Sequence, residues 1–371
     1  MTAFGAAVGQ GADRLGSYLA MVGREIADAE FTGDRARFCT RIAISVVLAV
    51  TLAQWARFDD VWWAGISAIM ASQATRPASV QRSLVRIVGT SAGIAVGFVA
   101  IALFAYDHVA LSLVLFICGT VGVAGMSLSR HGYAWLLVGL TANMVIVMAM
   151  NDPSQMPYIA FARIAGVATG CVAAVAMAIV LAPRAEAAPP AEAPGWTDLL
   201  GRNWPVVEHG IRSGITVMIL PSLWNLFELP SLNQMAISVM VVMSVPVTGA
   251  DAAAMGAAVL ERSVQRIIGC LLGGVLSLLL LATPLTVYPL WLAVLFAGVW
   301  VGALLQTSTR GASYMGIQAA VVFVVTLVQG DGPPSSLLPG IERLAGMLSG
   351  LVVLLLIGLV LWPTSRRPEA A

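Results

Sequence analysis

The chain has 371 residues, of which 59% are hydrophobic and 11% are charged. This balance excludes an ordinary soluble domain and indicates an integral membrane protein. All 20 basic residues are Arg, so the chain has no Lys for a Walker-type phosphate loop or a Schiff base. The net charge of +1 says little about partners, because in a membrane protein the positions of the charges matter more than their sum.

The chain divides into five predicted parts. Residues 1–38 mix charges with apolar positions on one helical stripe, which predicts a cytoplasmic amphipathic segment that lies on the membrane surface. A first repeat of six transmembrane helices is predicted over 39–183, followed by a Pro- and Ala-rich cytoplasmic linker at 184–206. A second six-helix repeat is predicted over 207–363, and a cytoplasmic tail over 364–371.

Twelve apolar segments within the two repeats are candidates for crossing the bilayer. They fall at about 40–56, 61–75, 86–105, 109–127, 133–150 and 163–182, and then at about 210–226, 232–248, 266–283, 287–305, 313–329 and 343–362. The expected fold is an all-α polytopic membrane protein of about 12 transmembrane helices.

The second set of six segments repeats the first. A shift of 180 residues places Arg86 on Arg266 and Arg163 on Arg343, and a shift of 171 places Arg41 on Arg212. Six is an even number of crossings, so the two repeats run in the same sense across the membrane. The sequence therefore predicts a fused pseudo-dimer of parallel repeats.

The Arg residues also predict the orientation of the chain. If the N-terminus is cytoplasmic, 17 of the 20 Arg fall on the cytoplasmic side, and only Arg57, Arg163 and Arg343 fall outside. This is the asymmetry of the positive-inside rule. We expect both termini in the cytoplasm.

A short motif occurs four times: Arg, Ile or Leu, any residue, then two Gly four apart. Glycines at this spacing lie on one helix face and let another backbone approach closely. We expect these helices to pack innermost, with the motif Arg at the membrane surface. The four pairs are Gly89 and Gly93, Gly166 and Gly170, Gly269 and Gly273, and Gly346 and Gly350.

The four motif Arg are candidates for a substrate site or pathway. Arg86 and Arg266 fall on the cytoplasmic side, where they are either snorkelling anchors or ligands. Arg163 and Arg343 fall on the side where Arg is disfavoured, and a planar guanidinium suits a carboxylate, so they are candidates for binding an anion. A structural role remains open for all four.

Two amides within the spans, Asn143 and Gln318, either bond between helices or line a polar path. The first two segments of each repeat are short, and the seventh segment contains Pro221. Short or interrupted spans at matching positions point to a substrate site, although tilted hairpins in a thinned bilayer are the alternative.

No constellation of catalytic residues is present. The Gly89–Gly93 segment matches a nucleophile-elbow pattern, but that motif needs a strand-to-helix turn, and here it lies in an apolar helix. The four Cys have no metal-ligand spacing. We expect no enzyme, no metal, no cofactor and no nucleic-acid partner.

Several short sequences of the first repeat resemble one family in their order and spacing. They are Trp62-Trp63-Ala64, Arg86-Ile-Val-Gly89-Thr90, Tyr133-Ala134-Trp135 with Gly139 and Thr141, Arg163 with Gly170, and Pro183-Arg184. Over residues 38–184 the chain resembles the fusaric acid resistance family, also called the aromatic acid exporter family. The second half is similar chiefly as a weaker copy of the first.

The resemblance implies an inner-membrane exporter of aromatic or related organic acids that works with a periplasmic adaptor protein. Plant aluminium-activated malate transporters look like distant relatives, which implies an Arg-lined anion path between the two halves. The larger exporters carry sizeable cytoplasmic domains after each set of spans, and this chain has only the short linker and tail there.

The sequence is therefore consistent with three functions. The first is efflux of organic anions, driven by an ion gradient because no ATPase motif is present. The second is a passive anion channel on the same fold. The third is a membrane scaffold without transport.

Overall fold

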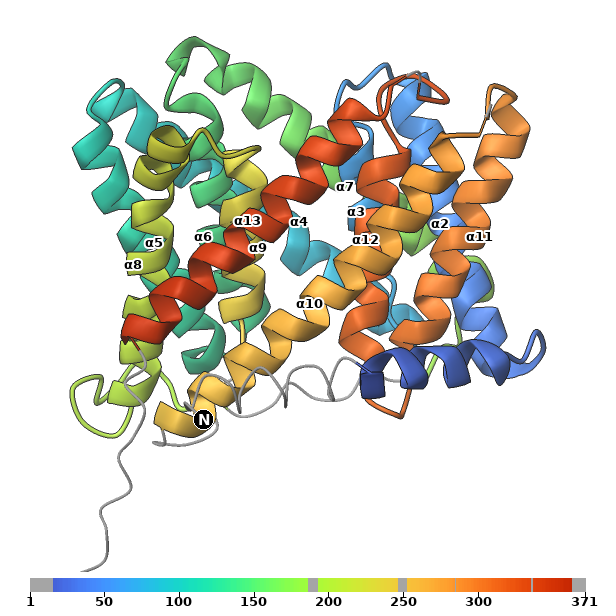
Figure 1. Cartoon of the computed structure of the whole chain (residues 1–371), viewed down its shortest axis with the longest axis horizontal. Helices are drawn as coiled ribbons and strands as arrows, with labels where there is room; N and C mark the ends of the chain where they lie inside the picture. The colour runs from blue at the N-terminus through green and yellow to red at the C-terminus, as the bar shows by residue number, and fades with distance from the viewer. Residues whose placement is uncertain (1–15, 186–192, 246–251, 284, 335, 362–371) are drawn as a thin grey trace, which may run out of the picture. The chain divides into compact units, whose positions relative to one another are not determined.

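A computed structural model describes residues 16–185, 193–245, 252–283, 285–334 and 336–361 of the chain (Figure 1). Over these ranges the chain forms helices joined by loops, with one isolated bridge between Gln329 and Gly332 and no strand. The predicted all-α fold class is confirmed. The predicted tail at 364–371 lies outside the described residues.

Each apolar segment predicted from the sequence overlaps one helix. In chain order the helices are α2 (Gly33–Trp55), α3 (Trp62–Ala71), α4 (Arg76–Phe104), α5 (His108–Leu128), α6 (Gly132–Ala149), the 3-10 turn η1 (Pro153–Gln155), α7 (Met156–Leu181), α8 (Trp204–Phe227), α9 (Leu232–Met243), α10 (Ala252–Leu281), α11 (Tyr288–Gln306), α12 (Ser313–Leu327) and α13 (Leu338–Leu361).

Eight of the helices in the described ranges are long and apolar enough to cross a membrane. Helices α3, α9 and α12 are shorter, with 10, 12 and 15 residues. The expectation of short segments is right for α3 and α9 and wrong for α2, which has 23 residues; α8 has 24 residues but is not among the eight helices apolar enough to span. Helices α2 and α8 both begin before the apolar run, because polar residues can continue a helix that hydropathy does not detect. The arrangement of twelve spans in two repeats stays a prediction.

The helices group into two compact units. Unit 1 takes in the described parts of 1–84, 165–187 and 264–344, and unit 2 those of 85–164, 188–263 and 345–371. Four of the five boundaries fall inside the motif helices α4, α7, α10 and α13, each within three residues of the motif Arg, and the fifth falls in the linker after residue 187. Both units therefore combine segments of the first predicted repeat with segments of the second.

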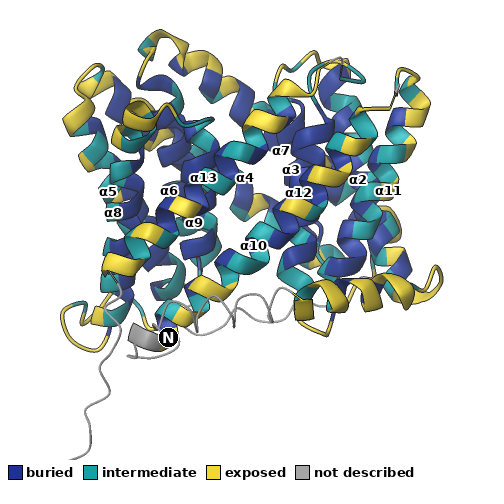
Figure 2. Ribbon diagram, in the orientation of Figure 1, coloured by how far each residue is buried: buried dark blue, intermediate teal, exposed yellow. Residues whose placement is uncertain are grey.

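In unit 1, α2 and α3 of the first repeat pack against α11 and α12 of the second. Helix α2 lies beside α11, and α3 contacts α12 (Figure 1). The Tyr288 hydroxyl donates to Gln54 Oε1 at 2.7 Å, and the Trp291 indole donates to the Leu327 carbonyl at 3.2 Å. Nine of the ten residues of α3 are buried, and Figure 2 shows α3 and α12 mainly in the buried colour. A helix this short is covered by protein rather than by lipid.

Unit 2 pairs the repeats in the opposite order. Here the later helices α5 and α6 of the first repeat pack against the early helices α8 and α9 of the second. Helices α5 and α8 meet through glycines: a Cβ added to Gly119 would lie 3.1 Å from the Gly214 Cα. Helices α5 and α6 meet at Gly122 and Gly139, with a corresponding distance of 2.9 Å. These close backbone approaches depend on missing side chains.

The helical residues 16–27, called the N-terminal helix below, lie on unit 1. Val22 is 6% exposed and packs with Ile268, Leu305, Ala312 and Met315. Leu19 and Ile26 of the predicted apolar stripe are both 47% exposed. One residue of the stripe therefore joins the core of the unit, while these two remain half exposed.

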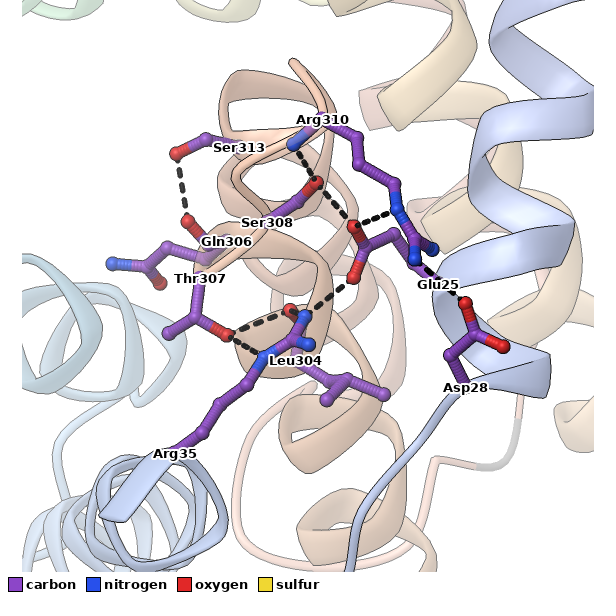
Figure 3. A network of polar contacts seen from close by, with 9 residues as sticks. All are labelled: Glu25, Asp28, Arg35, Leu304, Gln306, Thr307, Ser308, Arg310 and Ser313. Atoms are coloured by element: carbon purple, nitrogen blue, oxygen red, sulfur yellow. Dashed lines mark hydrogen bonds and ion pairs between the residues drawn. The ribbon is translucent and has the colours of Figure 1, made fainter.

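A polar network fixes this helix to the loop between α11 and α12 (Figure 3). Glu25, 2% exposed, accepts from Arg35 at 2.5 Å and from the Ser308 hydroxyl at 2.8 Å. Arg310 lies 3.7 Å from Glu25 and pairs with Asp28 at 2.7 Å. Burial alone would raise the pKa of Glu25, but these hydrogen bonds and the charges of Arg35 and Arg310 outweigh it and lower the pKa.

Candidate functional site

The four motif Arg lie inside their helices rather than at the helix starts. Helix α4 begins at Arg76, ten residues before Arg86, and α10 begins at Ala252, fourteen residues before Arg266. Arg163 is seven residues into α7, and Arg343 is five residues into α13. The predicted starts were wrong: α4 and α10 include polar residues before the motif Arg, whereas α7 and α13 begin with largely apolar residues before it. Arg86, Arg163 and Arg266 are 4%, 2% and 3% exposed, and Arg343 is partly buried.

Arg86 and Arg266 each bond to a side chain of a neighbouring helix in their own unit. In unit 2, Arg86 Nη1 donates to the Tyr133 hydroxyl of α6 at 2.7 Å. In unit 1, Arg266 Nη1 donates to Gln318 Oε1 of α12. Both guanidinium groups thus join a motif helix to a helix of the fifth or eleventh predicted span. These hydrogen bonds offset part of the free-energy cost of burying the two charges.

Arg343 is held by backbone and by an aromatic ring in unit 1. Its Nη1 donates to the Val325 carbonyl at 2.7 Å and lies 3.5 Å from the Val328 carbonyl, at the end of α12. Its Cζ lies 4.9 Å from the centre of the Trp62 ring, a cation–π distance. The carbonyls at a helix C-terminus carry partial negative charge, so this contact suits a cation.

The first and third Gly pairs pack on the helices that their motif Arg bonds. An added Cβ at Gly93 would lie 2.7 Å from the Val138 carbonyl oxygen of α6, and one at Gly89 would lie 2.9 Å from the Ala134 oxygen. In unit 1, an added Cβ at Gly269 would lie 2.7 Å from the Met315 oxygen of α12, and Gly273 meets the backbone of Ala319.

The second and fourth Gly pairs pack on the short helices α3 and α9. An added Cβ at Gly166 would lie 3.0 Å from the Trp63 Cβ, and one at Gly170 would lie 2.6 Å from the Ser67 Cβ. In unit 2, Gly346 packs on Ser231 and Gly350 on Met235, at 2.6 and 2.7 Å by the same measure. Each Gly pair therefore seats a motif helix against a helix of 10 to 18 residues in the same unit.

The two candidate amides have different surroundings. Gln318 is 4% exposed and accepts the bond from Arg266. Asn143, in α6, is 0% exposed, and neither its Oδ1 nor its Nδ2 has a hydrogen-bond partner among the described residues. Its Nδ2 lies 3.6 Å from the position of an added Cβ at Gly119 in α5. Buried amides are normally hydrogen-bonded, so Asn143 marks a place that water or a ligand can complete.

A pocket of about 580 Å³ lies in unit 2. Of its lining residues, only Pro221 was indicated by the sequence. It is formed by the first residues of α5, the end of α6 and the second half of α8. Pro221, the residue that pointed to a substrate site, is part of its lining, although α8 continues unbroken through it. The other lining residues come from three separate segments, and no local pattern in the sequence connects them.

No group of three or more His, Cys, Asp or Glu that could hold a metal ion occurs within the described ranges. The four Cys are all buried, and none of them forms a disulfide. The candidate groups thus lie in both units: Arg266, Gln318 and Arg343 in unit 1, and Arg86, Arg163, Asn143 and the pocket in unit 2.

Each half of the chain matches a fusaric acid resistance family model. Residues 35–193 match the Fusaric acid resistance protein family, and residues 216–357 match the Fusaric acid resistance protein-like family. The two matches together cover most of both predicted repeats.

Curated relatives carry the name p-hydroxybenzoic acid efflux pump subunit AaeB. The protein from Musicola paradisiaca (strain Ech703) is 26% identical over an alignment of 166 residues that covers 40% of this chain and 25% of the relative. The protein from Escherichia coli O9:H4 (strain HS) is 27% identical over 161 residues, 40% of this chain and 24% of the relative. The matched region thus spans about a quarter of these relatives.

No solved structure matches the chain significantly. The family matches in both halves and the apolar helices agree with the resemblance found in the sequence. The chain is a multi-pass membrane protein that belongs to the fusaric acid resistance family.

Proposed function

We propose that the chain is an inner-membrane efflux transporter of organic anions, with aromatic carboxylic acids as its substrates. The observation that carries this proposal is the family match in both halves, together with relatives named as p-hydroxybenzoic acid efflux pump subunits. An ion gradient is the proposed driving force, because the sequence has no Lys and hence no Walker-type loop. The word subunit in the relatives' name supports a partner protein, for which we propose a periplasmic adaptor.

We place the transport path where helices of one repeat face helices of the other. Within unit 2, α5 and α6 face α8 and α9, and within unit 1, α2 and α3 face α11 and α12. These contacts support the proposal because the polar groups Asn143 and Gln318 lie on such helices. Surfaces between repeats are the usual place for transporter sites.

Arg343 is the residue we propose for binding the substrate carboxylate. Its Nη1 is used by the α12 carbonyls, but its Nε and Nη2 donate no hydrogen bond to any described residue. That edge of a guanidinium binds a carboxylate through two parallel bonds. The contact with Trp62 fixes the plane of the group beforehand, so little side-chain freedom is lost on binding. The carboxylates of Asp60 and Glu342 act on Arg343 through their charges and oppose the binding of a second anion there.

Arg163, which a shift of 180 residues places on Arg343, is 2% exposed in α7. An Arg inside a membrane helix costs about 3 kcal/mol on insertion scales, so its presence suggests a function. We propose that Arg163 contributes to the field that attracts the anion, and that Arg86 and Arg266 line the path at positions fixed by Tyr133 and Gln318.

Purified protein in liposomes loaded with p-hydroxybenzoate tests the function. We expect p-hydroxybenzoate to leave these liposomes faster than it leaks from loaded liposomes without protein, and faster still when a proton gradient is imposed. We expect no unitary currents in a planar bilayer. Unitary currents without gradient-driven counterflow would establish the passive channel instead. The absence of efflux for a panel of aromatic acids would overturn the proposal.

The site assignment has its own test. Arg343→Gln keeps donors for the α12 carbonyls but removes the positive charge and the Nε–Nη2 edge that would bind the carboxylate. We expect the rate of efflux to fall at least about tenfold, which corresponds to the loss of one hydrogen bond to a charged group. Arg57→Gln is the matched control, because Arg57 is exposed and lies on the same predicted side. Both variants are first checked for an unchanged melting temperature. Normal efflux by Arg343→Gln would remove Arg343 from the site.

A further inference from the structure

The pocket in unit 2 lies between the two repeats at one end of three helices. Two of these helices, α5 and α6, come from the first repeat, and α8 comes from the second. Its volume of about 580 Å³ lies within the range of small-molecule sites. All of its lining belongs to unit 2, so the pocket is complete within one compact unit.

The lining combines hydrogen-bonding groups with apolar side chains. Polar groups come from each of the three segments: His108 and Ser112 from α5, Asn151 from the end of α6, and Ser222 and Asn225 from α8. None of the lining residues is a carboxylate, so the pocket is unsuited to a cation. Neutral N–H and O–H donors can bind an anion without the desolvation cost of a buried ion pair.

The apolar part of the lining suits a flat ring. Val109, Met150, Met218 and Ile219 contribute aliphatic and thioether surface. Methionine adapts to the shape of its partner and makes favourable contacts with aromatic rings. A ligand with an aromatic body and one anionic end matches both parts of the lining.

The two acidic residues next to the lining residues in the sequence are already engaged. Asp107 caps α5 by accepting from the Val109 and Ala110 N–H groups at 3.1 and 2.9 Å. Asp152, next to Asn151, accepts from the Ser154 hydroxyl and N–H, and these bonds lower its pKa. Both carboxylates are directed at their own loops and neither belongs to the lining.

Pro221 changes the backbone where α8 lines the pocket. Proline has no N–H, so the Val217 carbonyl lacks its usual donor one turn earlier in the helix. The ring of a proline also pushes the preceding turn away, which makes room beside the helix. This provides a local reason for a pocket at this level of α8.

The same helix faces lead from the pocket to Asn143. Asn143 precedes the lining residue Met150 by seven residues on α6, and Gly119 follows the lining residue Ser112 by seven on α5. Gly214 precedes Pro221 by seven residues on α8. Seven residues are nearly two helical turns, about 10 Å, so all three lie on pocket-facing stripes. Asn143 Nδ2 and Gly214 both lie within 4 Å of the position of an added Cβ at Gly119.

We infer that this pocket binds a small monocyclic aromatic carboxylate, with the ring against the methionines and the carboxylate on the Ser and Asn donors. The unpartnered amide of Asn143 is the next polar group along the same helix faces. This inference rests on the proposed function. It identifies a second binding position, in unit 2, where neutral donors rather than Arg bind the carboxylate.

Direct binding of p-hydroxybenzoate to the purified protein in detergent tests the pocket. Trp224 is part of the lining, so quenching of its fluorescence, taken as the difference from Trp224→Phe, reports occupancy. Ser222→Trp fills the pocket and is expected to weaken binding by more than about tenfold. Asn225→Ala removes one donor and is expected to weaken it by about fivefold. Leu226→Trp, at an exposed position outside the lining, is the control and keeps wild-type binding.

The outcomes separate this inference from the proposed function. Wild-type affinity in both Ser222→Trp and Asn225→Ala, with efflux intact, overturns the pocket and leaves the transporter standing. Binding that is lost in these two variants and kept in Leu226→Trp, without efflux by the wild type, supports the pocket and overturns the transporter. Absence of any quenching in the wild type also overturns the pocket.

Discussion

Gly170→Ala tests how closely the motif helix α7 packs on the short helix α3. The added Cβ would clash first with the Ala64 carbonyl oxygen, and it would lie 2.6 Å from the Ser67 Cβ and 2.9 Å from the Ala68 nitrogen. Carbon atoms in contact are normally about 3.5–4.0 Å apart, so the helices must separate by about 1 Å. Overpacking of this kind costs about 1–3 kcal/mol, and the better helix propensity of Ala offsets about 1 kcal/mol.

Gly166→Ala provides a matched comparison within the same motif and helix. Its added Cβ would lie 3.0 Å from the Trp63 Cβ, and its next neighbour would be 3.6 Å away, so a shift of about 0.5 Å suffices. We expect this variant to remain within about 0.5 kcal/mol of the wild type. Gly23→Ala, which meets nothing within 4 Å, is the control.

Thermal unfolding of the purified variants in detergent measures the difference. Gly170→Ala is expected to melt below Gly166→Ala, with Gly23→Ala at or above the wild type. If Gly170→Ala and Gly166→Ala melt at the same temperature, the close contact between α7 and α3 is not what these glycines provide.

Three further predictions concern buried polar groups. Gln318→Leu removes an acceptor of Arg266 and should destabilise the protein by about 1.5–3 kcal/mol. Asn143→Leu removes an amide without a partner in the described residues, so the melting temperature should stay or rise; a clear fall would show a hidden bond. Glu25→Gln should release the N-terminal helix and speed tryptic cleavage at Arg24; unchanged cleavage would refute it. Because the pKa of Glu25 is lowered, its contribution to wild-type docking is present above about pH 4.3 and is lost as the pH falls through the folded-state pKa. Cleavage, measured relative to that of an unstructured reference peptide at the same pH, should therefore be constant between pH 5 and 8.

The apolar runs made the helices predictable from the sequence. The segments expected at 133–150 and 287–305 correspond to α6 and α11 within one residue at each end. Such helices have few polar residues, so the limits of the apolar run are also the limits of the helix. The glycine pairs were predictable for a similar reason, because a missing side chain in an apolar helix has few uses other than close packing.

The depth of the motif Arg was not predictable by hydropathy. A charged residue before an apolar run marks the edge of lipid-compatible sequence, but the helix itself extends further, as α10 does for fourteen residues before Arg266. The partner of Arg266 is Gln318, 52 residues later, and nothing near either residue indicates the bond. The pocket combines three separate segments, so only Pro221 gave a local signal.

The exchange of helices between the repeats constrains how the chain can be made. Helices α2 and α3 are among the first to leave the ribosome, but their partners α11 and α12 follow more than 200 residues later. At 5–20 residues per second this delay is on the order of 10–50 s. During that time the nascent first half has exposed faces without their native neighbours, so insertion into the bilayer and assembly of the units must be separate events.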